Sequence, residues 1–270
     1  MRDGGPGYDP AVARATVDGV LMDSAQAQIS VTDEGLLRGD GVFEVIPLFG
    51  GRPFALQEHL ERMGRSAASL RLALDLGAVR EDIATILSGA EPSDATLRVL
   101  ATRGGRRIAL IEPPIELPPT LRLATITYAP TRVLDGIKSL SYAANMLATR
   151  LAEEQGADQA LLVTPHGRVL EGPTTSFFYV LDGGLCTPPL SERILDSITR
   201  RLLMSLTEAQ ERVTTRDDLA SISEAFLSSS SRPVQPVSAI DDISIEAAPG
   251  PVSTAVSEAA LRHIESALSS

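Results

Sequence analysis

The residue with the most distinctive chemical setting is Lys138, which lies among small and apolar side chains in residues 137–146 (IKSLSYAANM) and has no acidic neighbour within two positions. Partial removal of water lowers the pKa of a lysine and leaves a nucleophilic amine. Amines of this kind form Schiff bases with carbonyl cofactors, of which pyridoxal phosphate (PLP) is one. The alternative is a surface lysine at the start of a helix. Other motifs of the chain are needed to distinguish a reactive lysine from a surface lysine.

The composition is that of a globular protein and restricts its partners. The chain has 270 residues, of which 43% are hydrophobic and 22% charged, and this length allows one large domain or two modest ones. The net charge of -11 disfavours nucleic acid or an anionic membrane as the main partner. No apolar run reaches the roughly 18 residues that a membrane span needs, and the first ten residues lack the apolar core of a secretory signal. We therefore expect a cytoplasmic protein.

Metal binding is not expected. Cys186 is the single cysteine, which excludes an intrachain disulfide and disfavours a zinc site built from cysteines. The three histidines, His59, His166 and His263, are far apart in sequence and lack the spacing of metal ligands. We predict no metal site.

The periodicity of apolar residues predicts strands and helices that mix without strict alternation. Alternating and β-branched runs predict strands at 15–22, 41–49, 96–102, 107–111, 121–128, 159–163, 176–181 and 224–228. Apolar residues at helical spacing predict helices at 56–72, around 79–87, just after Lys138, around 195–206 and at 252–268. This order excludes a doubly wound parallel sheet and predicts an α+β (mixed α/β) fold.

A proline-rich segment predicts two domains. Residues 113–119 contain four prolines, which can continue neither a helix nor a central strand. We therefore expect a disordered N-terminus at 1–14, a small α/β domain at 15–112, a linker at 113–119 and a large α/β domain at 120–270.

Four short motifs resemble those of the fold type IV PLP enzymes. They are residues 38–44 (RGDGVFE), 59–62 (HLER), 138–140 (KSL) and 171–172 (EG), and they occur in the order found in that family. The family includes branched-chain and D-amino acid aminotransferases, (R)-selective amine transaminases and aminodeoxychorismate lyases. The resemblance covers most of the chain, about 17–240, and implies a two-domain fold like that of D-amino acid aminotransferase, with PLP bound to the larger domain.

The resemblance assigns roles to three residues. Lys138 would carry the internal aldimine and move the proton between the substrate α-carbon and the cofactor. Glu171 would pair with the pyridine nitrogen, because a protonated pyridine ring withdraws electrons from the reacting carbon. Arg62, on the same helix face as His59 and Ser66, would hold the phosphate with its planar fork of donors. The alternatives are a hairpin glutamate at 171 and a surface arginine at 62.

Further cofactor contacts follow from the same resemblance. Ile198 and Thr199 lie near a predicted helix start, where backbone N–H groups suit a phosphate. Ser229 and Ser230 match another phosphate-binding turn, although a flexible serine loop is an equal alternative. Tyr142, four residues after Lys138, is a candidate contact to the ring oxygen.

The residues expected in the substrate pocket differ from those of related enzymes. Phe43 stands where the D-amino acid enzymes have tyrosine, and Pro47 stands where several relatives have a basic residue. Because both residues are apolar, we expect the pocket to favour substrates with apolar substituents. Arg106 and Arg107, in a loop that resembles a substrate-binding loop but is shorter, or Arg38 are candidate partners of a substrate carboxylate.

The resulting prediction is a homodimeric PLP-dependent aminotransferase that moves an amino group between an amino acid, or an amine, and a 2-oxo acid. We expect a small or branched amino acid as donor and 2-oxoglutarate or pyruvate as acceptor. One alternative is a lyase that converts aminodeoxychorismate to 4-aminobenzoate and pyruvate. Another is a non-enzymatic PLP-binding or interaction protein, which the presence of both Lys138 and Glu171 disfavours. The stereochemistry of the donor stays open.

Overall fold

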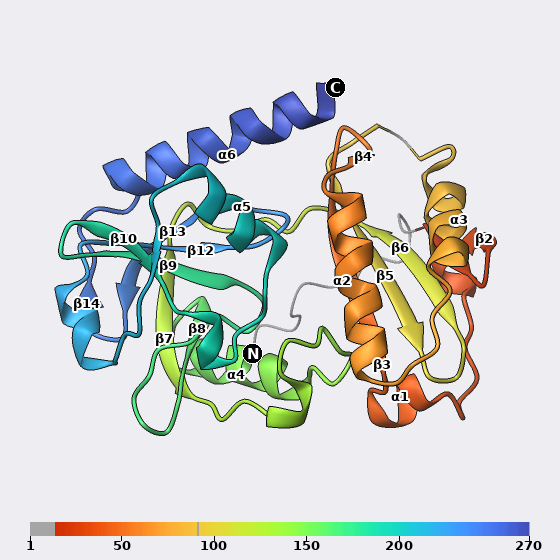
Figure 1. The fold of residues 1–270 in the computed structure, drawn as a ribbon, viewed down its shortest axis with the longest axis horizontal. Helices are drawn as coiled ribbons and strands as arrows, with labels where there is room; N and C mark the ends of the chain where they lie inside the picture. Colours follow the sequence, from red (N-terminus) through yellow and green to blue (C-terminus); the bar gives the residue numbers. More distant parts are fainter. Residues whose placement is uncertain (1–13, 91, 270) are drawn as a thin grey trace. The chain divides into compact units, whose positions relative to one another are not determined.

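The computed structural model describes residues 14–90 and 92–269, and these fall into two compact units (Figure 1). Unit 1 contains the described residues up to Ile115 together with Lys138–Leu140. Unit 2 contains Glu116–Ile137 and the described residues from Ser141 onward. The short segment around Lys138 therefore packs with unit 1, although it follows the proline-rich segment in the sequence. Of the N-terminus expected to be disordered, 1–13 lie outside the described residues, and Arg14 begins a strand.

Unit 1 is built on an antiparallel sheet with the strand order β2-β1-β6-β5-β3-β4. The strands are β1 Arg14–Val17, β2 Val20–Asp23, β3 Gly41–Phe49, β4 Arg52–Pro53, β5 Ala95–Thr102 and β6 Arg107–Glu112. The helices are the 3-10 turn Ser24–Gln26, α1 Glu34–Arg38, α2 Leu56–Ser69 and α3 Leu76–Leu87.

The core of unit 1 lies between one face of this sheet and the helices α2 and α3. Alternate residues of the strands, such as Val42, Ile46 and Leu97, point to that face, because successive side chains of a strand alternate. They meet Leu60 and Met63 of α2 and the apolar stripe of α3. The opposite face of β3 carries Phe43, which is outside this core cluster.

Unit 2 is built on a mixed sheet of eight strands with the order β11-β10-β9-β12-β13-β7-β8, and β14 pairs with β13. The strands are β7 Leu121–Thr127, β8 Gln159–Val163, β9 Ser176–Leu181, β10 Gly184–Thr187, β11 Gln210–Glu211, β12 Glu224–Ser228, β13 Gln235–Ile240 and β14 Ile243–Ser244. The helices are α4 Ala143–Glu154, α5 Ile198–Leu206, α6 Pro251–Ser269 and the 3-10 turns Arg132–Leu134, Leu190–Glu192 and Asp217–Ser221.

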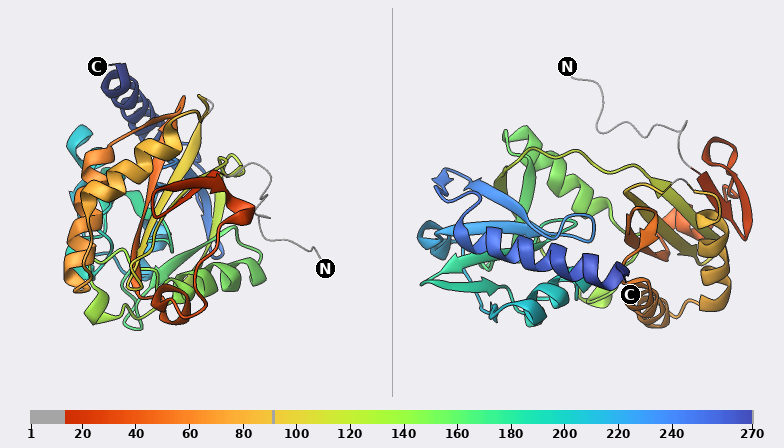
Figure 2. Two further views of the ribbon diagram at one scale, coloured as in Figure 1. Left: turned by 90° about the vertical axis from the view of Figure 1, so that its right-hand side faces the viewer. Right: turned by 90° about the horizontal axis from the view of Figure 1, so that it is seen from above.

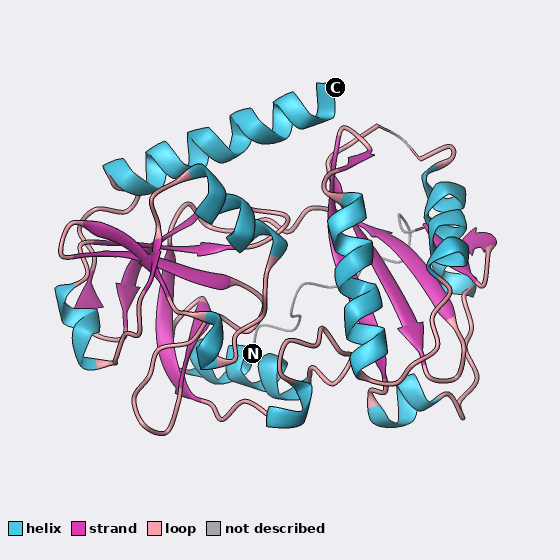
Figure 3. Cartoon of the chain, viewed as in Figure 1, coloured by secondary structure: helices cyan, strands magenta, loops and turns pink. Residues whose placement is uncertain are grey.

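The helices of unit 2 cover different parts of its sheet (Figure 3). Ala148 and Ala152 of α4 pack on β7 and β8, and Ala152 is fully buried. Leu203 of α5 and Val256 of α6 pack together with residues of β9 and β12, and α6 passes over these strands in the right-hand view of Figure 2. The order of strands and helices confirms the predicted mixed α/β fold.

Two predicted helix starts are wrong by several residues. The helix expected just after Lys138 begins only at Ala143, because Ser139 bridges to Val42 of β3 and Leu140 also bonds to that strand. The helix expected near 195 begins at Ile198, where the Ser197 side chain accepts a hydrogen bond from the Arg200 N–H. Within the described residues, no helix is long and apolar enough to cross a membrane.

Candidate functional site

Lys138 is held in place through its backbone. Its N–H donates to the Ser66 hydroxyl at 3.2 Å, and its carbonyl accepts from the Phe43 N–H at 3.2 Å. The Leu140 N–H donates to the Gly41 carbonyl at 2.9 Å. Only glycine fits at 41, because a Cβ there would lie 2.5 Å from the Ala101 carbonyl oxygen and 2.6 Å from a Leu140 methyl. The segment therefore lies along the start of β3 and is joined to it by an isolated β-bridge between Ser139 and Val42.

The Lys138 side chain lies over an aromatic ring. Only 8% of the residue is exposed, and its Nζ is 4.4 Å from the centroid of the Phe43 ring. The negative face of an aromatic ring attracts an ammonium at this distance, and partial loss of water strengthens that attraction. The arrangement rules out the alternative of a surface lysine at a helix start. It places a nearly buried amine at a fixed point beside Phe43.

Arg62 is buried in a cluster of charged groups in unit 1. Its Nε and one terminal nitrogen bind the two carboxylate oxygens of Glu44 at 2.7 and 2.6 Å. His59 Nδ1 lies 2.8 Å from the same carboxylate, and Glu44 has no exposed surface. The surface-arginine alternative is therefore wrong, because Arg62 is only 4% exposed. Arg62, His59 and Ser66 do share one face of α2, as the sequence spacing predicts.

Burial and the contacts within this cluster shift the pKa values of Glu44 and His59. Burial alone would raise the pKa of the Glu44 carboxyl, but hydrogen bonds from Arg62 and His59 outweigh burial and lower this pKa to about 2. Burial lowers the pKa of His59 by disfavouring its charged form. At neutral pH the cluster therefore contains a carboxylate, a guanidinium and a neutral imidazole.

Glu171 is anchored in unit 2 at the edge of the sheet. Its Oε1 accepts from the Leu195 N–H at 3.0 Å, and its carbonyl accepts from the Leu162 N–H at 2.9 Å. A tight turn follows it, closed by the bond from the Gly172 N–H to the Thr175 carbonyl at 2.8 Å. Burial, with a smaller effect of the Glu171 charge, raises the pKa of the Tyr128 hydroxyl.

Helix α5 starts three residues beyond Leu195. The first N–H groups of a helix have no acceptor within the helix and form a partly positive site for anions. Ser197 satisfies one of these groups, that of Arg200, at 3.3 Å. Ile198 and Thr199 form the first turn and are nearly buried. This is the helix start that the sequence predicts for a phosphate.

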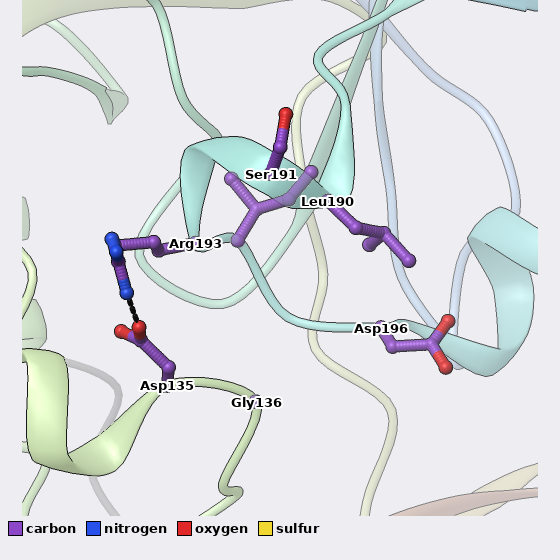
Figure 4. Close-up of a pocket in the computed structure, with 7 residues that line it drawn as sticks. Asp135, Gly136, Leu190, Ser191, Arg193 and Asp196 are labelled. Atoms are coloured by element: carbon purple, nitrogen blue, oxygen red, sulfur yellow. Dashed lines mark ion pairs between the residues drawn. The ribbon is translucent and has the colours of Figure 1, made fainter.

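A cavity of about 460 Å³ opens beside this loop (Figure 4). Its lining includes Asp135, Ile194 and Asp196, and an ion pair between Asp135 and Arg193 lies at one side. Arg193 has the left-handed backbone conformation, with φ of 67°. The loop that contacts Glu171 through Leu195 is thus also the wall of a cavity.

The remaining cofactor candidates lie in unit 2. Ser229 follows β12 and closes a turn in which its N–H donates to the Arg232 carbonyl at 2.9 Å. Ser230 lies within that turn. Tyr142 is the half-buried residue that precedes α4, and its carbonyl accepts from the Met146 N–H at 3.1 Å.

The three predicted carboxylate-binding arginines already have acidic partners. Arg38 pairs with Glu34, Arg106 with Asp18, and Arg107 with the nearly buried Asp82 at 2.8 Å. A substrate carboxylate would have to compete with these partners. Sequence reasoning missed Arg98, whose guanidinium carbon lies 5.9 Å from the centroid of the Phe43 ring. It also missed Glu44, although Glu44 ends the RGDGVFE motif.

Comparison with known proteins identifies the family. The family model for amino-transferase class IV matches residues 41–240. The chain belongs to the class IV aminotransferases. A protein of Methanocaldococcus jannaschii named "Putative branched-chain-amino-acid aminotransferase" is 33% identical over 252 residues, which cover 83% of this chain and 87% of that protein. D-alanine aminotransferase of Bacillus licheniformis is 29% identical over 266 residues, covering 90% and 94%.

Solved structures agree with this assignment. The fold IV transaminase CpuTA1 from Curtobacterium pusillum is similar with a TM-score of 0.83 and 27% identity, over 90% of this chain and 97% of that one. This class IV aminotransferase therefore uses PLP to move amino groups between an amino acid or amine and a 2-oxo acid. The predicted family, fold class, cofactor and reaction are confirmed, and no finding favours the lyase.

The described residues of the aminotransferase fit the cofactor chemically. In unit 1, Lys138 offers a nearly buried amine to the aldehyde of PLP. In unit 2, Glu171 offers a carboxylate to the pyridine nitrogen, and the N-terminus of α5 offers N–H donors to the phosphate.

Proposed function

We propose that Lys138 is the catalytic residue of this aminotransferase, which binds the cofactor aldehyde and then moves a proton at the substrate α-carbon. The observation that supports this proposal is the nearly buried Lys138 amine, which lies over the Phe43 ring. Lysine is among the side chains that act as general bases when they are positioned next to the reacting proton. The hydrogen bonds at Ser66 and Phe43 hold its backbone, so the amine returns to one position after each half-reaction.

Glu171 and Arg62 complete the proposed cofactor site. PLP, when bound, supplies the electron sink for the reacting carbon. The Glu171 carboxylate keeps the proton on the pyridine nitrogen, and the Leu195 N–H orients that carboxylate. Arg62 binds the phosphate in this proposal and shares its guanidinium with Glu44, which fixes the guanidinium plane. Ile198, Thr199, Ser229 and Ser230 supply further phosphate contacts, and Tyr142 contacts the ring oxygen.

The proposed donor is a small or branched amino acid, with 2-oxoglutarate or pyruvate as acceptor. Phe43 and Pro47 lie on the same side of β3, and both are buried and apolar. They favour an apolar substituent beside Lys138. The names of the relatives, branched-chain and D-alanine aminotransferase, fit a donor of this size and leave its stereochemistry to experiment.

The substrate carboxylate needs a cationic partner, and Arg98 joins Arg38, Arg106 and Arg107 as a candidate. Arg98 and Lys138 lie against the same Phe43 ring, so their charged groups are within about 10 Å of each other. Arg98 is bound by Glu112 at 2.9 Å and is about one third exposed. A substrate carboxylate would have to compete with Glu112 for Arg98, as it would with the acidic partners of the other three arginines.

A homodimer is part of the proposal. Residues 29–37 of unit 1 expose four apolar side chains, Ile29, Val31, Leu36 and Leu37, and Val31 is 76% exposed. Monomeric proteins rarely expose such patches. A self-complementary interface between two copies would bury them.

Borohydride reduction of the PLP-loaded enzyme, followed by peptide mapping, tests the central assignment. We expect the reduced adduct on Lys138. Lys138→Ala should bind PLP without a covalent bond and lose nearly all turnover. Glu171→Gln should keep the adduct and slow turnover about 10- to 100-fold, since a charge-assisted contact is worth roughly 1.5–3 kcal/mol. An adduct on another lysine would refute the assignment.

A donor screen under one assay tests the substrate. L-leucine, D-alanine, (R)-1-phenylethylamine and aminodeoxychorismate should be compared, and one of the two amino acids should be the best donor. A best donor without a carboxylate would exclude an arginine partner for the substrate. Turnover of aminodeoxychorismate alone, with release of pyruvate, would replace the transaminase by the lyase.

A further inference from the structure

Two buried serines of unit 2 support an assignment of phosphate contacts that neither the sequence motifs nor the names of the relatives provide. We propose that the Ser176 and Ser228 hydroxyls donate hydrogen bonds to the phosphate of the cofactor. The assignment rests on the proposed function, because it places the phosphate at the N-terminus of α5.

The two hydroxyls have no partner in the structure. Ser176 is 2% exposed and Ser228 is 1% exposed, and the Oγ of each is buried without a hydrogen bond. Buried polar groups in folded proteins are nearly always satisfied, so an orphaned hydroxyl requires an explanation such as a ligand. Here two such hydroxyls are neighbours, because Ser176 and Ser228 are directly opposite each other in the antiparallel pair β9–β12.

Both serines point to the face of the sheet that α5 covers. Side chains alternate along a strand, so Ser176 lies on the side of Phe178, and Ser228 lies on the side of Phe226. The rings of Phe178 and Phe226 stack with their centroids 5.1 Å apart and pack against Leu203 of α5. The serines therefore continue this face by one step beyond the aromatic pair.

Helix α5 runs in the direction that places its N-terminus at the end of β9 that carries Ser176. The residues at its C-terminal end, Leu206 and Thr207, line a groove together with Leu185 and Val252. Leu185 is opposite Val180 in the pair β9–β10, which is the end of β9 away from Ser176. Leu203 lies over the aromatic pair in the middle, so the first turn of α5 points toward Ser176 and Ser228.

Thr199 supports this placement. It is one helical turn before Leu203 and so lies on the same face of α5, and it is 6% exposed. The site then combines two orphaned hydroxyls, a helix N-terminus and the turn after β12 that begins at Ser229. Hydroxyl and N–H donors around a partly positive helix end suit a phosphate ester, because its oxygens accept several hydrogen bonds.

The turn after Glu171 connects the two ends of the proposed cofactor site. Glu171 immediately precedes the turn that the Gly172 N–H closes on Thr175, and Ser176 immediately follows it. One short segment would thus place both the partner of the pyridine nitrogen and a partner of the phosphate. This coupling explains why a serine hydroxyl is buried at the first position of β9.

The test compares PLP with pyridoxal, which lacks the phosphate. Apoenzyme carrying Ser176→Ala, Ser228→Ala or both should be titrated with each ligand, and the dissociation constants should be read from absorbance. We expect each single change to weaken PLP binding about tenfold and the double change more, since hydrogen bonds to charged groups are among the strong ones. Affinity for pyridoxal should stay at the wild-type value.

A matched control is Thr16→Val. The Thr16 hydroxyl is also buried without a partner, but it lies in β1 of unit 1, so this nearly isosteric change should alter neither affinity. Equal weakening of PLP and pyridoxal in the serine variants would show a structural role and overturn the proposal, as would unchanged PLP affinity. If instead neither ligand forms an adduct with Lys138 in the wild-type enzyme, the proposed function itself fails.

Discussion

At the scale of single residues, Glu44 explains why α2 buries polar side chains beside its apolar stripe. Its carboxylate has no exposed surface and receives hydrogen bonds from Arg62 and His59. A buried charge is tolerated only when it is paired and its lone pairs are satisfied. The cluster therefore fixes Arg62 in one orientation, and a phosphate bound to Arg62 would find that orientation already set.

Glu44→Gln tests the cluster through the pH dependence of stability. The pKa of Glu44 is about 2 in the folded state, below the ordinary value of 4.5 for this side chain. The carboxylate therefore contributes stability that is fully present above pH 4.5 and is lost as the pH falls toward 2. We expect the variant to be less stable by roughly 3 kcal/mol at pH 7, with the difference from wild type shrinking over that window.

Urea unfolding at several pH values measures this difference. The control is Glu61→Gln, which changes an exposed carboxylate on the same helix and should shift stability little. His59 adds an acid-sensitive contribution that begins near pH 6.5, because burial lowers its pKa in the folded state. A pH-independent difference between wild type and Glu44→Gln would contradict the depressed pKa.

At the scale of elements, the C-terminal helix α6 is joined to the sheet by a carboxylate. Glu224, at the start of β12, accepts from the Val252 and Ser253 N–H groups at 3.0 and 2.9 Å. Its side chain thus caps the first turn of α6 and carries negative charge at the positive end of the helix. Gly250 is required beside it, because a Cβ at that position would overlap the Glu224 side chain.

Glu224→Ala should therefore weaken α6 without touching the proposed cofactor site. We expect a loss of about 1–3 kcal/mol in unfolding free energy, since two buried N–H groups and the Ser253 hydroxyl lose a charged acceptor. Hydrogen exchange should show faster opening of α6 than of β9. Glu258→Ala, on the exposed side of the same helix, is the control. Equal exchange rates in the two variants would show that the cap does not stabilise α6.

At the scale of the whole molecule, the exposed apolar patch at residues 29–37 suggests where two copies meet. Leu36 and Leu37 of α1 are both more than half exposed. Replacing both by glutamate places charges in the proposed interface, where an unpaired charge cannot be buried. We expect light scattering to give twice 28.6 kDa for the wild type and about half that mass for the variant.

Leu261→Glu is the control for this experiment. Leu261 is an exposed leucine of α6 and lies outside the patch, so the variant should keep the wild-type mass. If the double variant at Leu36 and Leu37 keeps the dimer mass, the interface lies elsewhere on the molecule. If the wild type has the mass of a monomer, the homodimer proposal is wrong.

The sequence by itself determined the elements, the family and the cofactor. Local period and turn residues predict β5, α2 and β12 within a few residues, because side-chain alternation and helical spacing are properties of neighbouring positions. The motifs at 38–44, 59–62, 138–140 and 171–172 resemble those of the class IV aminotransferases, and the family model that matches residues 41–240 confirms the family.

The tertiary structure alone decided the partners of those residues. Nothing near Lys138 in the chain predicts that it lies over Phe43, since 95 positions separate them and strand pairing brings them together. The burial of Arg62 against Glu44 and the pairs of Arg106 and Arg107 with Asp18 and Asp82 have the same origin. Hydrogen bonds and ion pairs between distant segments depend on packing, and packing is not encoded in any local pattern.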